Sequence, residues 1–499
     1  MEIAVANPPR AWRNFAFNGA RILASAATGL AISIITARAL GPQAMGVYSF
    51  LIWIAGTMAS LASLGLSSTI SKYIAEYLGQ KRPAMAAKAA RAIVMLQIAV
   101  AVAVTILAIC IWPLFAHRQL PLILWALSVV IPSALQQTLL GLMEGKQRFD
   151  LQAVATLAGA LLQIALVIYF ALRKATIVGF LAANLLSTIA IVGLLFVLCR
   201  PALALPSALE EPAPDFNFAK KLFSFSLSVY GLWFLSLIVF DKSEMFFLRA
   251  FRAPEELAFY SIAFALGARL ATVGDSISEV LFPMFVTRYA QSGAAGLRGL
   301  CNRSLRYYCL FILPLYLWCV PLTPRLLNFF YGERYAAVAP VFQIMLITLL
   351  FSALLPIGSS ALFALDKQFS FLRYLVLVAA INLIFDFLLI PRYGAVGAAL
   401  ANGAAQALAA CAQARVLHKA LPGGFPFVVL LKIYLAGTVS VIPLVYCARM
   451  PHASFLLLSA SAVLALLLYI ALLVALRAIQ FDQLAVAKTN LHSFVSRKA

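Results

Sequence analysis

Two arginines stand in hydrophobic stretches that are long enough to cross a membrane. Arg21 lies in the stretch 12–38, and Arg269 lies in the stretch 255–289. A guanidinium binds phosphate through two parallel hydrogen bonds, so each arginine could hold an anionic group. An arginine in hydrocarbon costs roughly 2.5–3.5 kcal/mol on insertion scales, so each of these side chains needs water or a polar partner.

Small polar residues share a helix face with each arginine. At about 100° per residue, the first face holds Asn14, Asn18, Arg21, Ser25 and Thr28, and the second holds Arg269, Thr272, Ser276 and Glu279. Polar stripes of this kind are tolerated in a membrane helix when they face a water-filled cavity. We therefore expect one central cavity with seven substrate-binding residues: Arg21, Asn18, Ser25, Thr28, Arg269, Thr272 and Ser276.

Each charged residue also has a simpler interpretation. Arg21 could extend its side chain to the cytoplasmic membrane surface. Arg269 could form a structural ion pair with Asp275 or Glu279, and Asp386 could cap a helix or pair across helices. We therefore treat Asp275, Glu279 and Asp386 as candidates for coupling or for ion pairing.

The composition places these residues in a membrane protein. The chain has 499 residues, of which 64% are hydrophobic and 11% charged, and its mean hydropathy is +0.97. The hydrophobic residues form blocks of about 20, the length of a transmembrane helix, so we expect an all-α polytopic membrane protein. Lys and Arg flank the hydrophobic blocks and account for the net charge of +21, so we expect no nucleic acid partner.

Residues for catalysis or metal binding are scattered along the chain. The seven cysteines form no CxxC motif, and the four histidines do not cluster. The expected external loops are short, and none gathers histidine with carboxylates. We therefore expect no catalytic residues, no metal site, no cofactor and no enzyme activity.

The hydrophobic pattern predicts about fourteen transmembrane helices. They span 12–38, 43–78, 84–113, 120–143, 148–171, 175–199, 217–241, 255–289, 297–322, 336–365, 369–391, 394–420, 425–448 and 453–478. With both termini in the cytoplasm, the cytoplasmic segments hold more Lys and Arg than the external loops, as the positive-inside rule requires.

Three sequence matches recur in the same order with a period near 215 residues. Residues 38–50 resemble 249–262, residues 145–149 resemble 366–371, and residues 177–186 resemble 395–404. Six helices separate the two copies, so the repeat is parallel, as in transporters that bind substrate between two halves. We expect four parts: an N-lobe of six helices (1–200), a cytoplasmic linker (201–216), a C-lobe of six helices (217–422), and two extra helices with a basic cytoplasmic tail (423–499).

Acidic residues are distributed unevenly between the two halves. The first 200 residues contain only Glu2, Glu76, Glu144 and Asp150, and none falls in the middle of an expected helix. A multidrug exporter would need a buried carboxylate there to bind a cation. An arginine in its place favours an anionic substrate such as a phosphate or diphosphate group.

The segments 37–77 and 362–408 resemble the polysaccharide flippases of the multidrug/oligosaccharidyl-lipid/polysaccharide exporter superfamily. The helix number, the repeat and the linker fit this family along nearly the full length. The resemblance implies a protein of the bacterial inner membrane that flips undecaprenyl-diphosphate-linked oligosaccharides for surface polysaccharides such as O-antigen or exopolysaccharide. It also implies that arginines on the first and eighth helices, here Arg21 and Arg269, bind the diphosphate.

Alternative functions remain open from the sequence alone. The second interpretation is a multidrug or cation antiporter on the same fold, and the others are a membrane enzyme and a non-transporting scaffold. We expect as partners the lipid-linked oligosaccharide and membrane lipids, with polysaccharide polymerase machinery as an open alternative.

Overall fold

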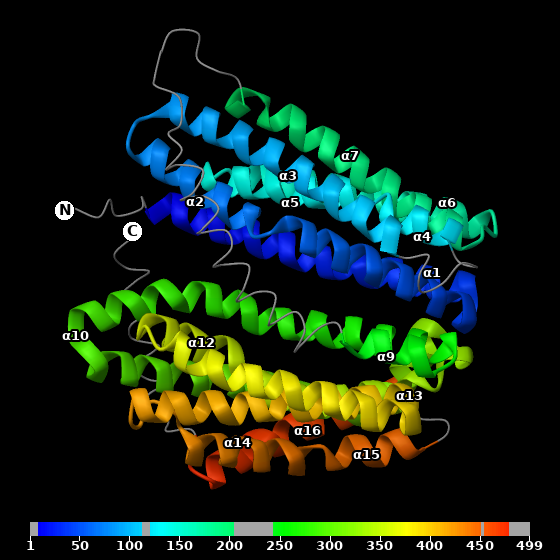
Figure 1. Cartoon of the computed structure of the whole chain (residues 1–499). Helices are drawn as coiled ribbons and strands as arrows, with labels where there is room; N and C mark the ends of the chain where they lie inside the picture. Colours follow the sequence, from blue (N-terminus) through cyan, green and yellow to red (C-terminus); the bar gives the residue numbers. More distant parts are fainter. Residues whose placement is uncertain (1–7, 112–119, 204–242, 451–453, 479–499) are drawn as a thin grey trace. The chain divides into compact units, whose positions relative to one another are not determined.

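The computed structural model describes residues 8–111, 120–203, 243–450 and 454–478 (Figure 1). Side chains are described throughout these ranges except at 8–23, 120, 201–203, 368 and 455. The expected seventh helix (217–241), most of the expected linker and the basic tail therefore lie outside the described residues.

The described residues are helical nearly throughout. Seven helices and helical segments come first: α1 (Pro8–Ser63), α2 (Leu66–Gly79), α3 (Pro83–Ile111), α4 (Leu120–Leu127), α5 (Val130–Gly145), α6 (Phe149–Leu172) and α7 (Ile177–Leu203). Nine more follow: α9 (Ser243–Phe251), α10 (Pro254–Tyr331), η4 (Glu333–Tyr335), α11 (Val338–Ser352), α12 (Leu355–Ala364), α13 (Gln368–Ala420), α14 (Phe427–Ser440), α15 (Ile442–Arg449) and α16 (Phe455–Ala475). The prediction of an all-α membrane protein is confirmed.

Three of these helices are interrupted by a glycine with non-helical backbone angles. Gly41 divides α1, Gly293 divides α10 and Gly394 divides α13. Figure 1 shows α10 folded back on itself as a hairpin. Ten helices of the described ranges are long and apolar enough to cross a membrane, and these three each contain two such lengths. The arrangement is consistent with fourteen helices, a number that stays a prediction.

The chain divides into two compact units, each with its own packing. Unit 1 contains Met1–Ile262, Tyr331–Tyr335 and Asn382–Ala398, and unit 2 contains Ala263–Phe330, Ala336–Ile381 and Ala399–Ala499. Unit 1 thus combines the first half of the chain with three short pieces of the second half.

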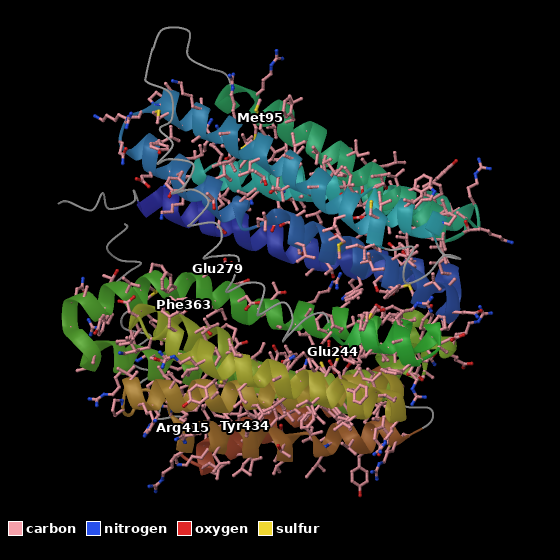
Figure 2. The ribbon with its side chains drawn as sticks, in the orientation of Figure 1. Met95, Glu244, Glu279, Phe363, Arg415 and Tyr434 are labelled. Carbon is pink, nitrogen blue, oxygen red and sulfur yellow. The ribbon has the colours of Figure 1, made fainter. Side chains whose placement is uncertain are left out.

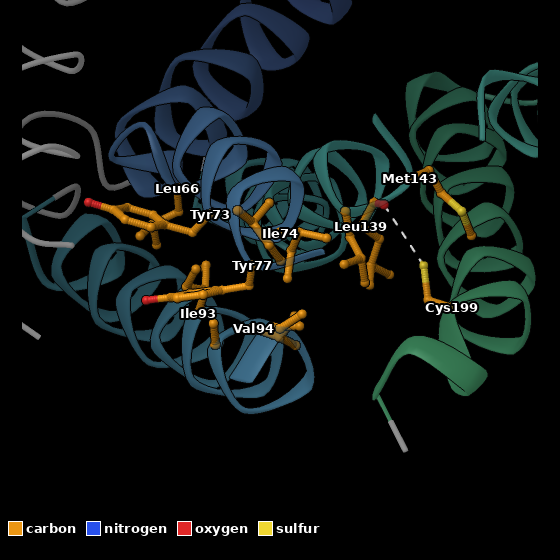
Figure 3. Packing of buried hydrophobic residues seen from close by; sticks show 14 of the residues in the cluster. Leu66, Tyr73, Ile74, Tyr77, Ile93, Val94, Leu139, Met143 and Cys199 are labelled. Atoms are coloured by element: carbon orange, nitrogen blue, oxygen red, sulfur yellow. Dashed lines mark hydrogen bonds between the residues drawn. The ribbon is translucent and has the colours of Figure 1, made fainter. Parts of the chain in front are cut away.

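A hydrophobic core holds the first half of unit 1 together. Leucine, isoleucine and tyrosine side chains of α2 pack against small and branched residues of α3, α5 and α7 (Figure 3). The rings of Tyr73 and Tyr77 stack with their centroids 6.3 Å apart, and the Cys199 thiol lies 3.9 Å from the Leu139 carbonyl oxygen. Alanines 86, 89 and 90 of α3 let the helices approach closely, as small residues do in membrane bundles.

The expected helix 43–78 is not continuous. It breaks at Leu64 and Gly65, whose φ angles are 43° and 70°, and α2 begins only at Leu66. A break leaves backbone carbonyls without their helical partners, and such groups cannot remain unsatisfied in a membrane. The Gln97 amide of α3 fills this need by donating to the Ala62 carbonyl at 2.8 Å.

Two corresponding regions of the two halves share their backbone hydrogen bonds. The α4–α5 break bonds Ser128 N to Leu124 O and Val129 N to Ala126 O, and the α11–α12 break repeats this pattern at Ala353 and Leu354. The loops that follow, 146–148 and 365–367, also share one pattern, with Gln147 and Asp366 both at positive φ. The same hydrogen-bond pattern with a positive φ also ends helices at 80–82, 173–175 and 476–478, so it does not test the repeat, and the lobe boundaries stay a prediction.

The last three helices pack within unit 2. Helix α16 contacts both α14 and α15. Tyr469 of α16 donates to the Leu310 carbonyl of α10 at 2.8 Å. Trp318 of α10 donates to Ser440 of α14 at 2.9 Å. Both α14 and α16 are therefore hydrogen-bonded to the second arm of α10.

Candidate functional site

The first predicted polar face lies on α1, in unit 1. Asn18 and Arg21 fall within this helix, but their side chains lie outside the described residues. Ser25 is exposed, and the half-buried Thr28 donates to the Ala24 carbonyl at 2.8 Å. A hydroxyl bonded to its own helix adds little cost to a membrane span, so Thr28 tolerates either lipid or water.

The second predicted polar face lies on the first arm of α10, in unit 2. Arg269 is half-buried and donates from Nη1 to the Ala265 carbonyl at 2.9 Å. Thr272 and Ser276 each donate at 2.9 Å to the carbonyl four residues before. The helix therefore carries a guanidinium whose charge is partly shielded from solvent, which is the environment in which arginine binds oxyanions most strongly.

The acids near Arg269 are exposed side chains of the same helix. Both Asp275 and Glu279 lie on the surface of α10, and Figure 2 labels Glu279 there. Their pairing with Arg269 stays a prediction. A cavity shared by Arg21 and Arg269 also stays a prediction, because the two residues belong to different units.

A second group of polar residues lies where α9 meets α13, inside unit 1. Glu244 and Asp386 are fully buried, and Asn382 is fully buried one helical turn before Asp386. Asn382 donates to the Ser243 hydroxyl at 3.0 Å, and Glu244 acts electrostatically on Asp386. We name Ser243, Glu244, Asn382 and Asp386 the acidic cluster; Figure 2 labels Glu244 on α9.

The acidic cluster has a chemistry that suits a small cation. Among the described residues, the amide oxygen of Asn382 accepts no hydrogen bond, and the Ser243 hydroxyl is placed to donate to the Asp386 carboxylate. Two carboxylates buried side by side repel each other, and burial removes the water that would offset their charge. These oxygen atoms are suited to hold a proton or a metal ion, because carboxylate and amide oxygens are ligands for hard cations.

The sequence identified only part of this cluster. Asp386 was expected as a coupling or ion-pair residue, whereas Glu244 was missed because it follows Asp241 and Lys242 and resembles a loop residue. The four-residue spacing of Asn382 and Asp386 puts both on one helix face, and this spacing was the available signal.

Charged residues also fix the loop before α10 to the turn inside α13. Arg252 donates to the carbonyls of Ile390 and Pro391, at 3.1 and 2.7 Å. Glu256 accepts from the Ala395 amide at 2.7 Å, where the second arm of α13 begins. An acid at a helix start satisfies a free amide and favours the helix dipole, so this loop holds α9 and α13 together around the acidic cluster.

The two copies of the first repeat motif touch inside unit 1. Ser261 donates to Ser49 at 2.8 Å, and these serines occupy equivalent positions of the two copies. Gly46 lies so close to Pro254 that a Cβ there would come within 1.7 Å of the Pro254 carbonyl oxygen. The two copies of the motif are therefore in direct contact.

Two family models match different parts of this chain. A family model described as "Polysaccharide biosynthesis protein" matches residues 11–288, and one described as "Lipid II flippase MurJ" matches residues 263–470. An uncharacterized membrane protein of Methanocaldococcus jannaschii is 26% identical over 171 residues, which is 34% of this chain and 34% of that protein. The match thus spans about a third of the relative's length.

Two solved structures share the fold. A lipid II flippase MurJ in an inward closed conformation superposes with a TM-score of 0.69 at 14% identity, covering 91% of this chain and 97% of the other. An inward-facing multidrug resistance MATE family transporter of the MOP superfamily gives a TM-score of 0.63 at 14% identity, covering 84% and 95%. At these identities the likeness establishes the fold and leaves the substrate open.

Proposed function

Since the chain belongs to the polysaccharide biosynthesis protein family, we propose that it flips a polyprenyl-diphosphate-linked oligosaccharide across a bacterial inner membrane. The oligosaccharide would serve surface polysaccharide synthesis, as O-antigen or exopolysaccharide. The transport would follow alternating access between the two halves, without enzymatic chemistry and with both termini in the cytoplasm. A polysaccharide polymerase is the partner that would receive the flipped substrate.

The half-buried Arg269 is the observation that carries this proposal. It stands in a helix of membrane-spanning length, near the hydroxyl residues Thr272 and Ser276. A diphosphate offers several charged oxygens to a guanidinium, and binding inside a partly dry site strengthens that interaction. Arg21, Asn18, Ser25 and Thr28 would bind the same group from α1.

The acidic cluster would couple transport to a cation. Binding of H⁺ or Na⁺ at Glu244 and Asp386 would neutralise their charge and change the packing of α9 against α13. A ligand shifts a conformational equilibrium only through different contacts in its two states, and a cation at this contact meets that condition.

The same cluster favours a second candidate function, a multidrug or cation antiporter. In an antiporter the cation and the exported compound compete for one acidic site. The two functions differ in their substrates: the flippase requires Arg269 for an anionic lipid, whereas an antiporter requires the acids for a cationic compound.

Replacement of Arg269 tests the proposal directly. We expect Arg269→Ala to abolish transport of a lipid-linked diphosphate in proteoliposomes at normal protein abundance. Arg269→Lys should retain part of the activity, because lysine keeps the charge and loses the two-pronged hydrogen bonding. Arg21→Ala should match Arg269→Ala, and the double variant should be no worse than the more damaging single change.

Arg373→Ala is the matched control, because Arg373 is an exposed arginine at the start of α13 outside the expected site. Normal transport by Arg269→Ala would contradict the proposal. Loss of export of a cationic dye in Asp386→Asn, with glycan transport intact, would favour the antiporter.

A further inference from the structure

The turn of the α10 hairpin contains a pocket that the proposed transport does not use. Its volume is about 670 Å³, within the range of roughly 300–1,000 Å³ that is typical of small-molecule sites. Residues of both arms line it, on either side of Gly293. Arg288, Thr287 and Gln291 face it from the first arm, and Arg303 faces it from the second.

Four arginines near the turn of the hairpin fall into two groups. Arg298 donates to the Pro422 carbonyl at 3.5 Å, and Arg306 donates to the Ala478 carbonyl, so both bind backbone at the ends of neighbouring segments. Arg288 and Arg303 line the pocket, and among the described residues neither has a hydrogen bond or an ion pair. The pocket therefore contains two guanidinium groups that are available to a ligand.

The part of the hairpin that forms the pocket carries positive charge and no acidic residue. The sequence contains no Asp or Glu between Glu279 and Glu333. The helix restarts after Gly293, whose φ and ψ are 59° and −157°, so the first turn of the second arm also borders the pocket. Free amides at a helix start favour an anion. Two arginines and a helix start together indicate a site for a phosphate group.

The surroundings of the pocket indicate that this phosphate belongs to a lipid. Met284, which also lines the pocket, is 48% exposed, and the exposed rings of Tyr289 and Tyr307 flank the arginines along the two arms. Tyrosines beside exposed apolar residues and arginines are typical of the boundary between membrane and water. A ligand there can place its phosphate among the arginines and its chains along the apolar surface.

We propose that the pocket lined by Arg288 and Arg303 binds the phosphate headgroup of an anionic membrane lipid. Gly296 contributes by its lack of a side chain, because a Cβ there would lie 3.3 Å from the Arg288 Nε and 2.4 Å from the Ser292 Cβ. Basic pockets of membrane proteins at the cytoplasmic surface bind such headgroups. The proposal does not depend on the transported substrate, because neither arginine belongs to the expected transport site.

Native mass spectrometry of the purified full-length protein tests this. The protein is titrated in three separate experiments, with phosphatidylglycerol, with zwitterionic phosphatidylcholine and with farnesyl diphosphate. In Arg288→Gln/Arg303→Gln, affinity for the bound anionic lipid should fall about tenfold or more, since two charge-assisted contacts are lost. Arg288→Lys/Arg303→Lys should lose less, and phosphatidylcholine should bind weakly to every variant.

Arg298→Gln is the control, since it removes the same charge from the same hairpin outside the pocket. Loss of phosphatidylglycerol binding identifies the ligand as a glycerophospholipid. Loss of farnesyl diphosphate binding alone identifies it as a diphosphate lipid. Unchanged binding of both lipids to the double glutamine variant, or equal loss in Arg298→Gln, overturns the proposal. Neither result bears on transport by Arg269.

Discussion

The two halves of the chain differ in how they bury polar side chains. In the first half, Gln97 of α3 donates to the Ala62 carbonyl and accepts from the Thr138 hydroxyl at 2.9 Å, so a neutral amide is satisfied on both sides. In the second half, Glu244 and Asp386 are buried; among the described residues they are the only fully buried charged side chains. The neutral network is satisfied by protein groups, whereas the acids are suited to bind a proton or a metal ion.

We infer from this difference that the neutral network contributes to stability and the acidic cluster to coupling. Buried neutral groups with partners contribute modestly to stability, at about 0.5–1.5 kcal/mol for each hydrogen bond. Buried carboxylates are weak evidence for stability and indicate a functional role when they lie in a membrane protein. We therefore expect substitutions in the Gln97 network to change folding and substitutions in the acidic cluster to change transport.

The largest effect should come from placing an acid in the neutral network. Gln97→Glu would set a carboxylate against the Ala62 carbonyl, so the acid must take up a proton to fit. From the ordinary glutamate pKa of about 4.3, that costs about 3.7 kcal/mol at pH 7 and about 1 kcal/mol at pH 5. The free energy of unfolding in mixed micelles at the two pH values measures this, and a cost independent of pH would contradict it.

Removing a charge from the acidic cluster should lower transport without lowering stability. We expect Asp386→Asn and Glu244→Gln to lower transport at least about tenfold, or about 1.4 kcal/mol, because the cation loses a ligand. Stability should not fall, since a neutral amide is easier to bury than a carboxylate. Transport in proteoliposomes and thermal unfolding measure both effects.

The exposed pair of Arg148 and Asp150, whose atoms lie 3.0 Å apart, supplies the control. Asp150→Asn also removes a carboxylate, and its transport should equal that of the unmodified protein. If Asp386→Asn transports as well as this control, the acidic cluster has no coupling role.

Removing the amide of Gln97 should have a smaller effect on folding alone. Gln97→Leu leaves the Ala62 carbonyl unsatisfied, whereas Thr138 keeps its bond to the Ala134 carbonyl at 3.2 Å. We expect a loss of about 1–3 kcal/mol in the free energy of unfolding, the cost of one unsatisfied buried group. Transport per folded molecule should be unchanged, and a specific transport defect would show that the comparison between the halves is wrong.

The smallest effect should appear where the two repeat motifs touch. Ser261→Ala and Ser49→Ala should each cost about 1 kcal/mol, and the double variant should cost less than the sum, because both remove one hydrogen bond. A double-mutant cycle of unfolding free energies measures the coupling. Additive effects would show that the contact between Ser49 and Ser261 contributes nothing to stability.

The features that the sequence did not predict depend on contacts between residues far apart in the chain. The blocks of hydrophobic residues predicted most helices within a few residues, because a membrane-spanning length is a local property. The break at Leu64 and Gly65 was not predicted, because the Ala62 carbonyl beside it is satisfied by Gln97, which lies on another helix. Glu244 was missed for the same reason: its burial depends on α13, which lies far along the chain.

The sequence by itself determined the class of the protein and most of its helices, whereas the internal repeat and the two arginine-bearing faces stay predictions. Hydropathy and helical periodicity act over a few turns, so one chain is enough to read them. Only the tertiary structure decided that Glu244 and Asp386 are buried together, that Ser49 meets Ser261, and that Arg288 and Arg303 border one pocket. Burial and the proximity of charges depend on residues that meet only when the helices pack.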